Sequence, residues 1–195
     1  MTKGPKTLVH VCWGDVGPLD AEYHDTEWGR PCHDDAELFE RLMLEGFQAG
    51  LSWSLILARR ERFRDAFDAW DARRIADYGA DDIARLMADP GIVRNRLKVN
   101  GAVKNARAFL ELQEEHGTFD RYIWSFVGGA PLVRPAPAAS GEVPALTAES
   151  DAMSRALKKR GLIFVGSTIC YAFMQSVGMV NDHLADCPAR ATIPA

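Results

Sequence analysis

Residues able to bind a metal ion occur as two pairs near opposite ends of the chain. Cys12 and His24 lie near the N-terminus, and His183 and Cys187 lie at positions i and i+4, a spacing that places both side chains on one face of a helical turn. Together they form a Cys2His2 set, which suits tetrahedral zinc, and four protein ligands would make such a site structural. The alternative of unrelated residues stays open, because free Cys is often buried as a small apolar side chain, and because further candidate ligands stand at His10, Cys32, His33, His116 and Cys170.

Aromatic residues crowd the first quarter of the chain, at Trp13, Tyr23, Trp28 and Trp53. Such residues usually pack in a core. The same side chains also hold flat ligands, since a base stacked on an aromatic ring gains about 1–3 kcal/mol. The pattern alone is compatible with both interpretations.

Glu45 lies at the edge of the apolar stripe formed by Leu38 and Leu42, and a Gly turn carrying Leu51 and Trp53 follows it. A carboxylate directed toward an apolar, aromatic region costs free energy unless it has a partner. The alternative is a solvated Glu near the end of a helix, and periodicity does not decide between the two.

Two segments could bind an anion through their backbone. Asp89-Pro90-Gly91-Ile92-Val93-Arg94 separates two helical patterns, and Gly166-Ser167-Thr168 precedes the last one. Backbone amides at such a turn, together with the following helix N-terminus, can hold a phosphate. The alternative is an ordinary pair of helices, with Arg94 and the basic residues after it forming a solvated surface.

The elements that must position these residues are helices. Apolar residues recur at helical spacing over several segments, and Asp34 or Asp35 is placed to cap the first of them. A Pro- and Gly-rich stretch over 128–144 can only be a connection, and no strand alternation is present. The expected class is therefore all-α, with helices over 34–47, 52–67, 73–78, 81–87, 95–115, 122–127, 150–160 and 167–179.

Length and charge narrow the function further. The chain has 195 residues and a formal net charge of −4, which fits one domain or two small lobes and argues weakly against nucleic acid as a partner. Net charge does not decide the matter, because a local basic patch suffices for binding. No apolar run reaches the roughly 18 residues of a membrane span, and no signal peptide is recognisable, so we expect a cytoplasmic protein.

Several long blocks, in family order from about Cys12 to Cys187, closely resemble 3-methyladenine DNA glycosylase type I. They are Tyr23-His24-Asp25-x-Glu27-Trp28-Gly29, Leu44-Glu45-Gly46-x-Gln48-Ala49-Gly50-Leu51-Ser52-Trp53, Gly91-Ile92-Val93-Arg94, Trp124-Ser125-Phe126-Val127, Phe164-Val165-Gly166-x-Thr168-Ile169-Cys170-Tyr171 and Asn181-Asp182-His183 with Cys187.

The resemblance implies an all-α, helix-hairpin-helix DNA glycosylase fold with a structural zinc site joining the N- and C-terminal segments. The chain would then form a single glycosylase unit over 1–195, with a helix-hairpin-helix lobe over about 34–127 and a zinc-binding lobe over 1–33 plus 148–195. One zinc per chain is expected, because its ligands in the family match Cys12, His24, His183 and Cys187.

The resemblance also implies that the protein flips 3-methyladenine out of alkylated duplex DNA and hydrolyses its N-glycosidic bond. Tyr23, Glu45 and Trp53 match the residues of the base pocket, with Trp28 nearby, and Glu45 would recognise the base. One departure stands out, since a pocket Tyr of some members is Asp20 here.

Contacts to DNA are expected from Leu51, as a wedge in the gap left by the flipped base, and from phosphate-binding residues. The latter are Gly91 and Arg94 of the hairpin and Ser167 and Thr168 at the last helix. No Lys stands out as a Schiff-base nucleophile, so we expect no strand cleavage. We expect a monomer with no obligate protein partner and no membrane contact. The competing hypothesis is a zinc-stabilised module that binds alkylated DNA without cleaving it.

Overall fold

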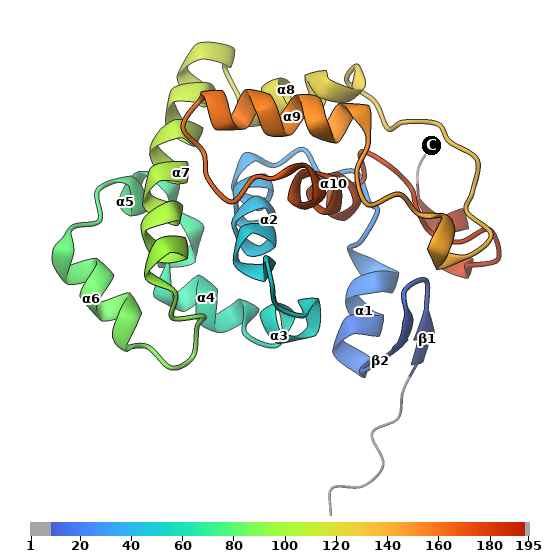
Figure 1. The fold of residues 1–195 in the computed structure, drawn as a ribbon, viewed down its shortest axis with the longest axis horizontal. Helices are drawn as coiled ribbons and strands as arrows, with labels where there is room; N and C mark the ends of the chain where they lie inside the picture. The colour runs from blue at the N-terminus through green and yellow to red at the C-terminus, as the bar shows by residue number, and fades with distance from the viewer. Residues whose placement is uncertain (1–8, 194–195) are drawn as a thin grey trace, which may run out of the picture.

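The computed structural model describes residues 9–193, so positions 1–8 and 194–195 of the expected zinc-binding lobe lie outside the described residues. Helices make up most of this part of the chain (Figure 1). They are α1 (Pro18–Thr26), α2 (Asp35–Gln48), α3 (Trp53–Leu57), α4 (Arg60–Ala66), α5 (Ala72–Ala76), α6 (Ala80–Ala88), α7 (Arg96–His116), α8 (Phe119–Trp124), α9 (Ala148–Lys159) and α10 (Ser167–Ser176). Short 3-10 turns add η1 (Asp68–Trp70), η2 (Ser125–Val127), η3 (Ser140–Glu142) and η4 (Pro188–Thr192).

Helix α2 runs through the centre of the molecule, with α7 on one side and α10 on the other (Figure 1). Every residue from Leu38 to Phe47 is buried. The Asp34 side chain caps the helix by accepting a hydrogen bond from the Glu37 amide at 3.0 Å. The helix expected over 34–47 is confirmed, and it carries Glu45 near its C-terminal end.

The long helix expected over 95–115 is also confirmed as α7. Its N-cap is Asn95, whose side chain accepts from the amides of Leu97 and Lys98 at 3.0 and 3.2 Å. Gly117 ends the helix with a φ of +87°, a conformation that glycine adopts without strain. The helical class is thereby confirmed for the described residues.

The helix expected over 52–67 is wrong as a single element, because the chain breaks into α3 and α4 at Arg59 (φ −112°, ψ 3°). Apolar periodicity continues across the break and therefore hides it. The break lets α4 turn so that the Nε atoms of Arg60 and Arg64 donate to Glu40 of α2, at 2.6 and 3.1 Å.

The expected absence of strands is also wrong. Strands β1 (Val9–Val11) and β2 (Gly14–Val16) pair antiparallel, with Val9 opposite Val16. Strands of three residues are too short to display alternation. Helix α1, which follows them, was not expected either, because its apolar residues form no continuous stripe. Within residues 9–193, no helix combines the length and the apolar composition that crossing a bilayer requires.

The last helix ends at Ser176, three residues before the expected limit, because Gly178 adopts a φ of +74°. A Cβ atom at Gly178 would lie 2.3 Å from the carbonyl carbon of Arg30 and from the Pro31 nitrogen. Two further contacts join these segments, since the Gly29 amide donates to Gln175 O and the Cys32 amide to Val177 O. The end of α10 therefore holds the segment after α1 in place.

We predict that Gly178→Ala destabilises the protein by about 3–5 kcal/mol, because it adds both a left-handed strain and a clash with backbone atoms. Gly161→Ala is the matched control, since Gly161 also has a positive φ but no atom within 4 Å of the added Cβ. It should cost about 1–2 kcal/mol. Urea unfolding measures both. Equal losses in the two variants would show that the contact with residues 30–31 is unimportant.

Candidate functional site

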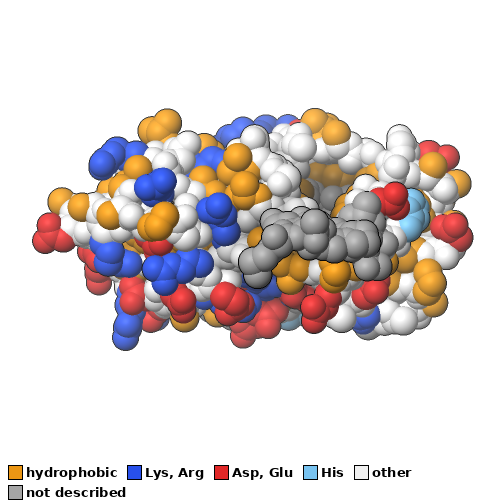
Figure 2. Space-filling model, turned by 90° about the horizontal axis from the view of Figure 1, so that it is seen from below, with side chains coloured by type: hydrophobic (Ala, Val, Ile, Leu, Met, Phe, Trp, Pro, Cys, Tyr) orange, Lys and Arg blue, Asp and Glu red, His pale blue; other side chains and the backbone are white. Residues whose placement is uncertain are grey.

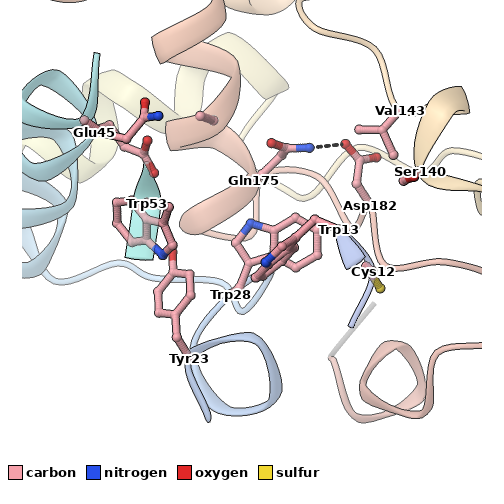
Figure 3. Close-up of a pocket in the computed structure, with 12 residues that line it drawn as sticks. Cys12, Trp13, Tyr23, Trp28, Glu45, Trp53, Ser140, Val143, Gln175 and Asp182 are labelled. Atoms are coloured by element: carbon pink, nitrogen blue, oxygen red, sulfur yellow. Dashed lines mark hydrogen bonds between the residues drawn. The ribbon is translucent and has the colours of Figure 1, made fainter. Parts of the chain in front are cut away.

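A cavity of about 380 Å³ opens between α1, α2, α3 and α10 (Figure 3). Seen from below, the surface is hollowed, with apolar side chains at the bottom of the hollow (Figure 2). The residues lining the cavity are mostly aromatic or polar: Cys12, Trp13, Tyr23, Trp28, Glu45, Gln48, Trp53, Ser140, Val143, Ala172, Gln175 and Asp182. The structure thus brings Tyr23, Trp28, Glu45 and Trp53 into one site.

The wall nearest α2 is formed by Tyr23 of α1 and Trp53 of α3. Their ring centroids lie 5.1 Å apart with the planes tilted by 45°. Trp53 is the first residue of α3, which Ser52 caps by accepting from the Leu55 amide. The indole Nε1 of Trp53 is buried and has no hydrogen-bond partner in the described part of the chain. An unpaired donor in a cavity is free to meet a ligand.

Asp20, which the resemblance places at a pocket Tyr of some family members, is not among the residues that line this cavity. It is buried and accepts a hydrogen bond of 2.7 Å from the Ser54 hydroxyl. Asp20 stands one helical turn before Tyr23, and Ser54 directly follows Trp53. The pair therefore joins α1 to α3 beside the two aromatic rings.

Glu45 is 5% exposed, so it is not a solvated surface residue. Its carboxylate makes no hydrogen bond or ion pair to another described residue, and Figure 3 shows it directed toward Trp53. Burial raises the pKa of Glu45 to about 8, well above the ordinary value of a carboxyl group. Burial therefore favours the neutral acid, and a cation beside Glu45 would favour the carboxylate.

The opposite end of the cavity is polar. Asp182 is buried, and its Oδ2 accepts from Tyr171 Oη at 2.6 Å and from Gln175 Nε2 at 2.8 Å (Figure 3). Ser140 and Val143 of the Pro-rich connection close this end. Sequence reasoning did not find these residues as pocket residues, or Gln48. Gln48 carries a signal, because it lies one helical turn after Glu45, and both Gln48 and Asp182 stand in the motif blocks quoted above.

Three of the four expected metal ligands come together at the edge of the cavity. The ligand atoms of Cys12, His24 and Cys187 all lie within 4.8 Å of one another. His24 Nε2 is 3.7 Å from Cys187 Sγ, and its Nδ1 is 2.7 Å from the Asp25 carboxylate. Metal-bound His residues commonly use their second nitrogen in this way.

His183 lies beside this cluster but is directed elsewhere. Its ring centroid is 4.7 Å from that of His24, while its nitrogens lie 3.1 Å from Asn181 Oδ1 and 3.4 Å from His24 O. Gly29 packs directly on this ring, since a Cβ there would lie 2.8 Å from His183 Cε1. The competing candidates Cys32 and Cys170 are buried in the core, away from the cluster.

The expected hairpin connects α6 to α7. The Gly91 amide is not free for a phosphate, because it donates to Asp89 Oδ1 at 2.7 Å, and Asp89 pairs with Arg62 at 3.1 Å. The amides of Ile92, Val93 and Arg94 make no hydrogen bond to another described residue, and the Arg94 side chain is exposed. Anion binding by this segment stays a prediction, and it would fall to the amides after Gly91.

The remaining expected DNA contacts lie on two other segments. Leu51 is half-buried in a tight turn, where its amide donates to Gln48 O and its carbonyl accepts from Gln48 Nε2, both at 2.6 Å. Ser167 and Thr168 are the first residues of α10, whose N-cap is Gly166, and Thr168 is exposed.

Residues 13–191 match the profile of a protein family that is described as methyladenine glycosylase. The chain belongs to this family. It is 48% identical over 180 residues to the DNA-3-methyladenine glycosylase of Haemophilus influenzae, covering 92% of this chain and 97% of the relative. It is 47% identical over 175 residues to DNA-3-methyladenine glycosylase 1 of Escherichia coli, covering 90% and 93%.

Solved structures of the family have the same fold as this chain. A crystal structure of 3-methyladenine DNA glycosylase I superposes with a TM-score of 0.88 at 44% identity, over 92% of this chain and 98% of that one. A Tyr-to-Phe variant in complex with 3-methyladenine superposes with a TM-score of 0.89 at 32% identity, over 93% and 97%. A third structure, which concerns 3-methyladenine recognition by the Staphylococcus aureus enzyme, gives 0.89 at 32% identity, over 93% and 96%.

We predict that Glu45→Gln changes how the stability of this methyladenine glycosylase depends on pH. Unfolding returns Glu45 to its ordinary pKa of 4.5, so between pH 4.5 and about 8 the folded state binds the proton more tightly, and stability falls as pH rises. Gln does not titrate. One pKa unit corresponds to about 1.4 kcal/mol, so the stability of the variant relative to wild type should grow by about 2–4 kcal/mol from pH 5 to pH 8. Urea unfolding at both pH values measures this. A constant difference would mean that Glu45 is charged throughout.

Proposed function

We propose that this protein excises 3-methyladenine from alkylated duplex DNA by hydrolysing the N-glycosidic bond, without cleaving the strand. The observation that carries the proposal is the buried carboxylate of Glu45, which has no partner among residues 9–193 and lies inside an aromatic cavity large enough for a base. A cation is the ligand that such a carboxylate favours, and an alkylated purine in DNA is a flat cation.

Recognition combines stacking and charge. The rings of Tyr23 and Trp53 stack on the base, and their quadrupoles attract its positive charge. Glu45 accepts a hydrogen bond from the exocyclic amine and balances the charge. Shape alone discriminates one methylene by only about 1–3 kcal/mol, so the carboxylate provides the selectivity that shape does not.

The nucleobase does not need to be protonated before it leaves, because the leaving group is already cationic. The bond between C1′ and the base nitrogen breaks, and its electron pair neutralises the base. Water adds to C1′ and loses a proton, which gives an abasic sugar and free 3-methyladenine. Among the described residues, no Lys lines the cavity, and a glycosylase that also cleaves the strand needs such an amine.

The duplex is held by backbone contacts that carry no sequence information. Arg94 and the hairpin amides after Gly91 bind phosphates, as do Ser167 and Thr168 at the N-terminus of α10. Flipping the base costs a few kcal/mol, and Leu51 fills the gap that the base leaves. In Figure 2, basic side chains lie among acidic ones over the half of the molecule that contains α4 to α7.

A structural zinc ion completes the proposal. The donor set fits it, since two thiols and an imidazole already converge and Asp25 orients the second nitrogen of His24. His183, which is buried next to them, would be the fourth ligand after a turn of its ring. Zinc would join the β1–β2 hairpin and α1 to the C-terminal segment and take no part in the reaction.

Release of free base from methylated DNA tests the function. We expect the protein to release 3-methyladenine, quantified by chromatography. We expect Glu45→Gln to weaken binding of free 3-methyladenine by tenfold or more, since a hydrogen bond to a charged group contributes about 1.5–3 kcal/mol. Glu114→Gln on the exposed face of α7 is the control and should bind as wild type does. Tight binding to alkylated DNA without release would instead identify a non-catalytic binding module.

Zinc content tests the metal site. We predict about one zinc per chain, and its loss in Cys187→Ala together with a lower melting temperature, because the ion joins distant segments. Cys32→Ala, which removes a buried thiol outside the cluster, should keep its zinc. Base release by the variant that remains folded should change little. Elemental analysis that finds no zinc in native protein would exclude the site.

A further inference from the structure

One cation of the basic segment at the start of α7 is directed inward. Arg94, Arg96 and Leu97 are exposed, the last by 72%, whereas Lys98 is 7% exposed. Lys98 therefore does not belong to the surface that its neighbours form. Its place at the beginning of α7 follows directly from the hairpin, because the Asn95 cap fixes the Lys98 amide.

The Lys98 ammonium binds the end of another helix. Its Nζ donates to Phe47 O at 2.8 Å and to Ala49 O at 2.6 Å, the carbonyls at the C-terminus of α2. Such carbonyls have no partner within their own helix and carry partial negative charge. The C-cap residue Ala49 makes no local capping bond of its own. Lys98 of α7 thus satisfies the C-terminal carbonyls of α2, a role that a glycine at the end of the helix commonly fills.

This arrangement has a cost that a local cap would avoid. Lys98 forms no ion pair with a carboxylate among the described residues, and burial lowers the pKa of its ammonium group. Burying an unpaired charge is unfavourable. A purely local capping function does not need a buried charge, which directs attention to the two segments that Lys98 connects.

It links two segments with different roles. On one side lies the hairpin of residues 89–95, with the exposed Arg94. On the other lies the turn of residues 48–52, which begins three residues after Glu45 and contains Leu51. That turn is closed internally by the two hydrogen bonds between Gln48 and Leu51. Lys98 thus connects the segment next to the base pocket with the phosphate-binding segment.

We propose that Lys98 is a positioning residue that fixes the 48–52 turn to the hairpin, so that the hairpin, once seated on DNA, places Leu51 and the cavity at the flipped nucleotide. The proposal rests on the function proposed above. In this view Lys98 touches neither base nor phosphate. It affects how often a bound duplex reaches the flipped state, and not how tightly the cavity holds a free base.

The test compares Lys98→Met with Lys104→Met, since Lys104 is an exposed cation on the same helix. Three quantities are measured on methylated duplex DNA and on free 3-methyladenine: the single-turnover release rate at saturating enzyme, the duplex affinity and the free-base affinity. We expect Lys98→Met to lower the release rate tenfold or more, with both affinities within threefold of wild type. Lys104→Met should stay within twofold in all three.

Two further variants distinguish the loss of the Lys98 contact from a loss of folding. Lys98→Arg can donate to both carbonyls and should recover most of the rate, and Lys98→Gln, which keeps a donor without the charge, should be intermediate. An unchanged rate in Lys98→Met would overturn the proposal. So would a parallel fall in free-base affinity, because Lys98 would then only support the cavity. Failure of the wild-type protein to release base is a separate outcome, which would contradict the proposed function itself.

Discussion

The structure depends on the burial of α2 along nearly its whole length. A helix in this position brings charged side chains and terminal backbone groups into the interior, where each needs a partner. Neighbouring elements supply them. Arg60 and Arg64 of α4 pair with Glu40, Arg41 donates to Ser176 O at the end of α10, and Lys98 of α7 caps the C-terminal carbonyls. The polar contacts of α2 therefore fix the positions of the helices around it.

Glu45 differs from the other buried charged residues of α2. The other two buried charged residues of α2, Glu40 and Arg41, have partners in the described chain, and Glu45 has none. Burial of an unpaired carboxylate is unfavourable, so a positively charged ligand in the cavity would stabilise it. Trp53 Nε1, in the same cavity, likewise has no hydrogen-bond partner among the described residues. Both groups belong to the cavity wall and are held in place by the helices that carry them, α2 and α3.

Much of this could be predicted from the sequence. The periodicity and caps of α2 and α7 are local signals, and both helices lie where they were expected. The break at Arg59 and the β1–β2 hairpin were missed, because pairing with Glu40 and strands of three residues leave no periodic trace. Tyr23, Glu45 and Trp53 were predicted as pocket residues because they stand in long motifs that resemble those of the family. Ser140 and Val143 could not be found, since their place at the cavity depends on how an irregular connection folds, and Asp182 stood in a motif block but was assigned no role.

Asp20 is buried near the aromatic rings without lining the cavity. A carboxylate introduced beside the aromatic rings would compete with Glu45 for the charge of the ligand if it faced the cavity. Asp20 instead turns toward α3 and accepts from Ser54, so its hydrogen bond is made within the protein and between the two helices that carry Tyr23 and Trp53. This contact joins the two segments next to the ring pair. Of the two carboxylates that line the cavity, Asp182 accepts from Tyr171 and Gln175, which leaves Glu45 as the one without a hydrogen-bond partner among the described residues.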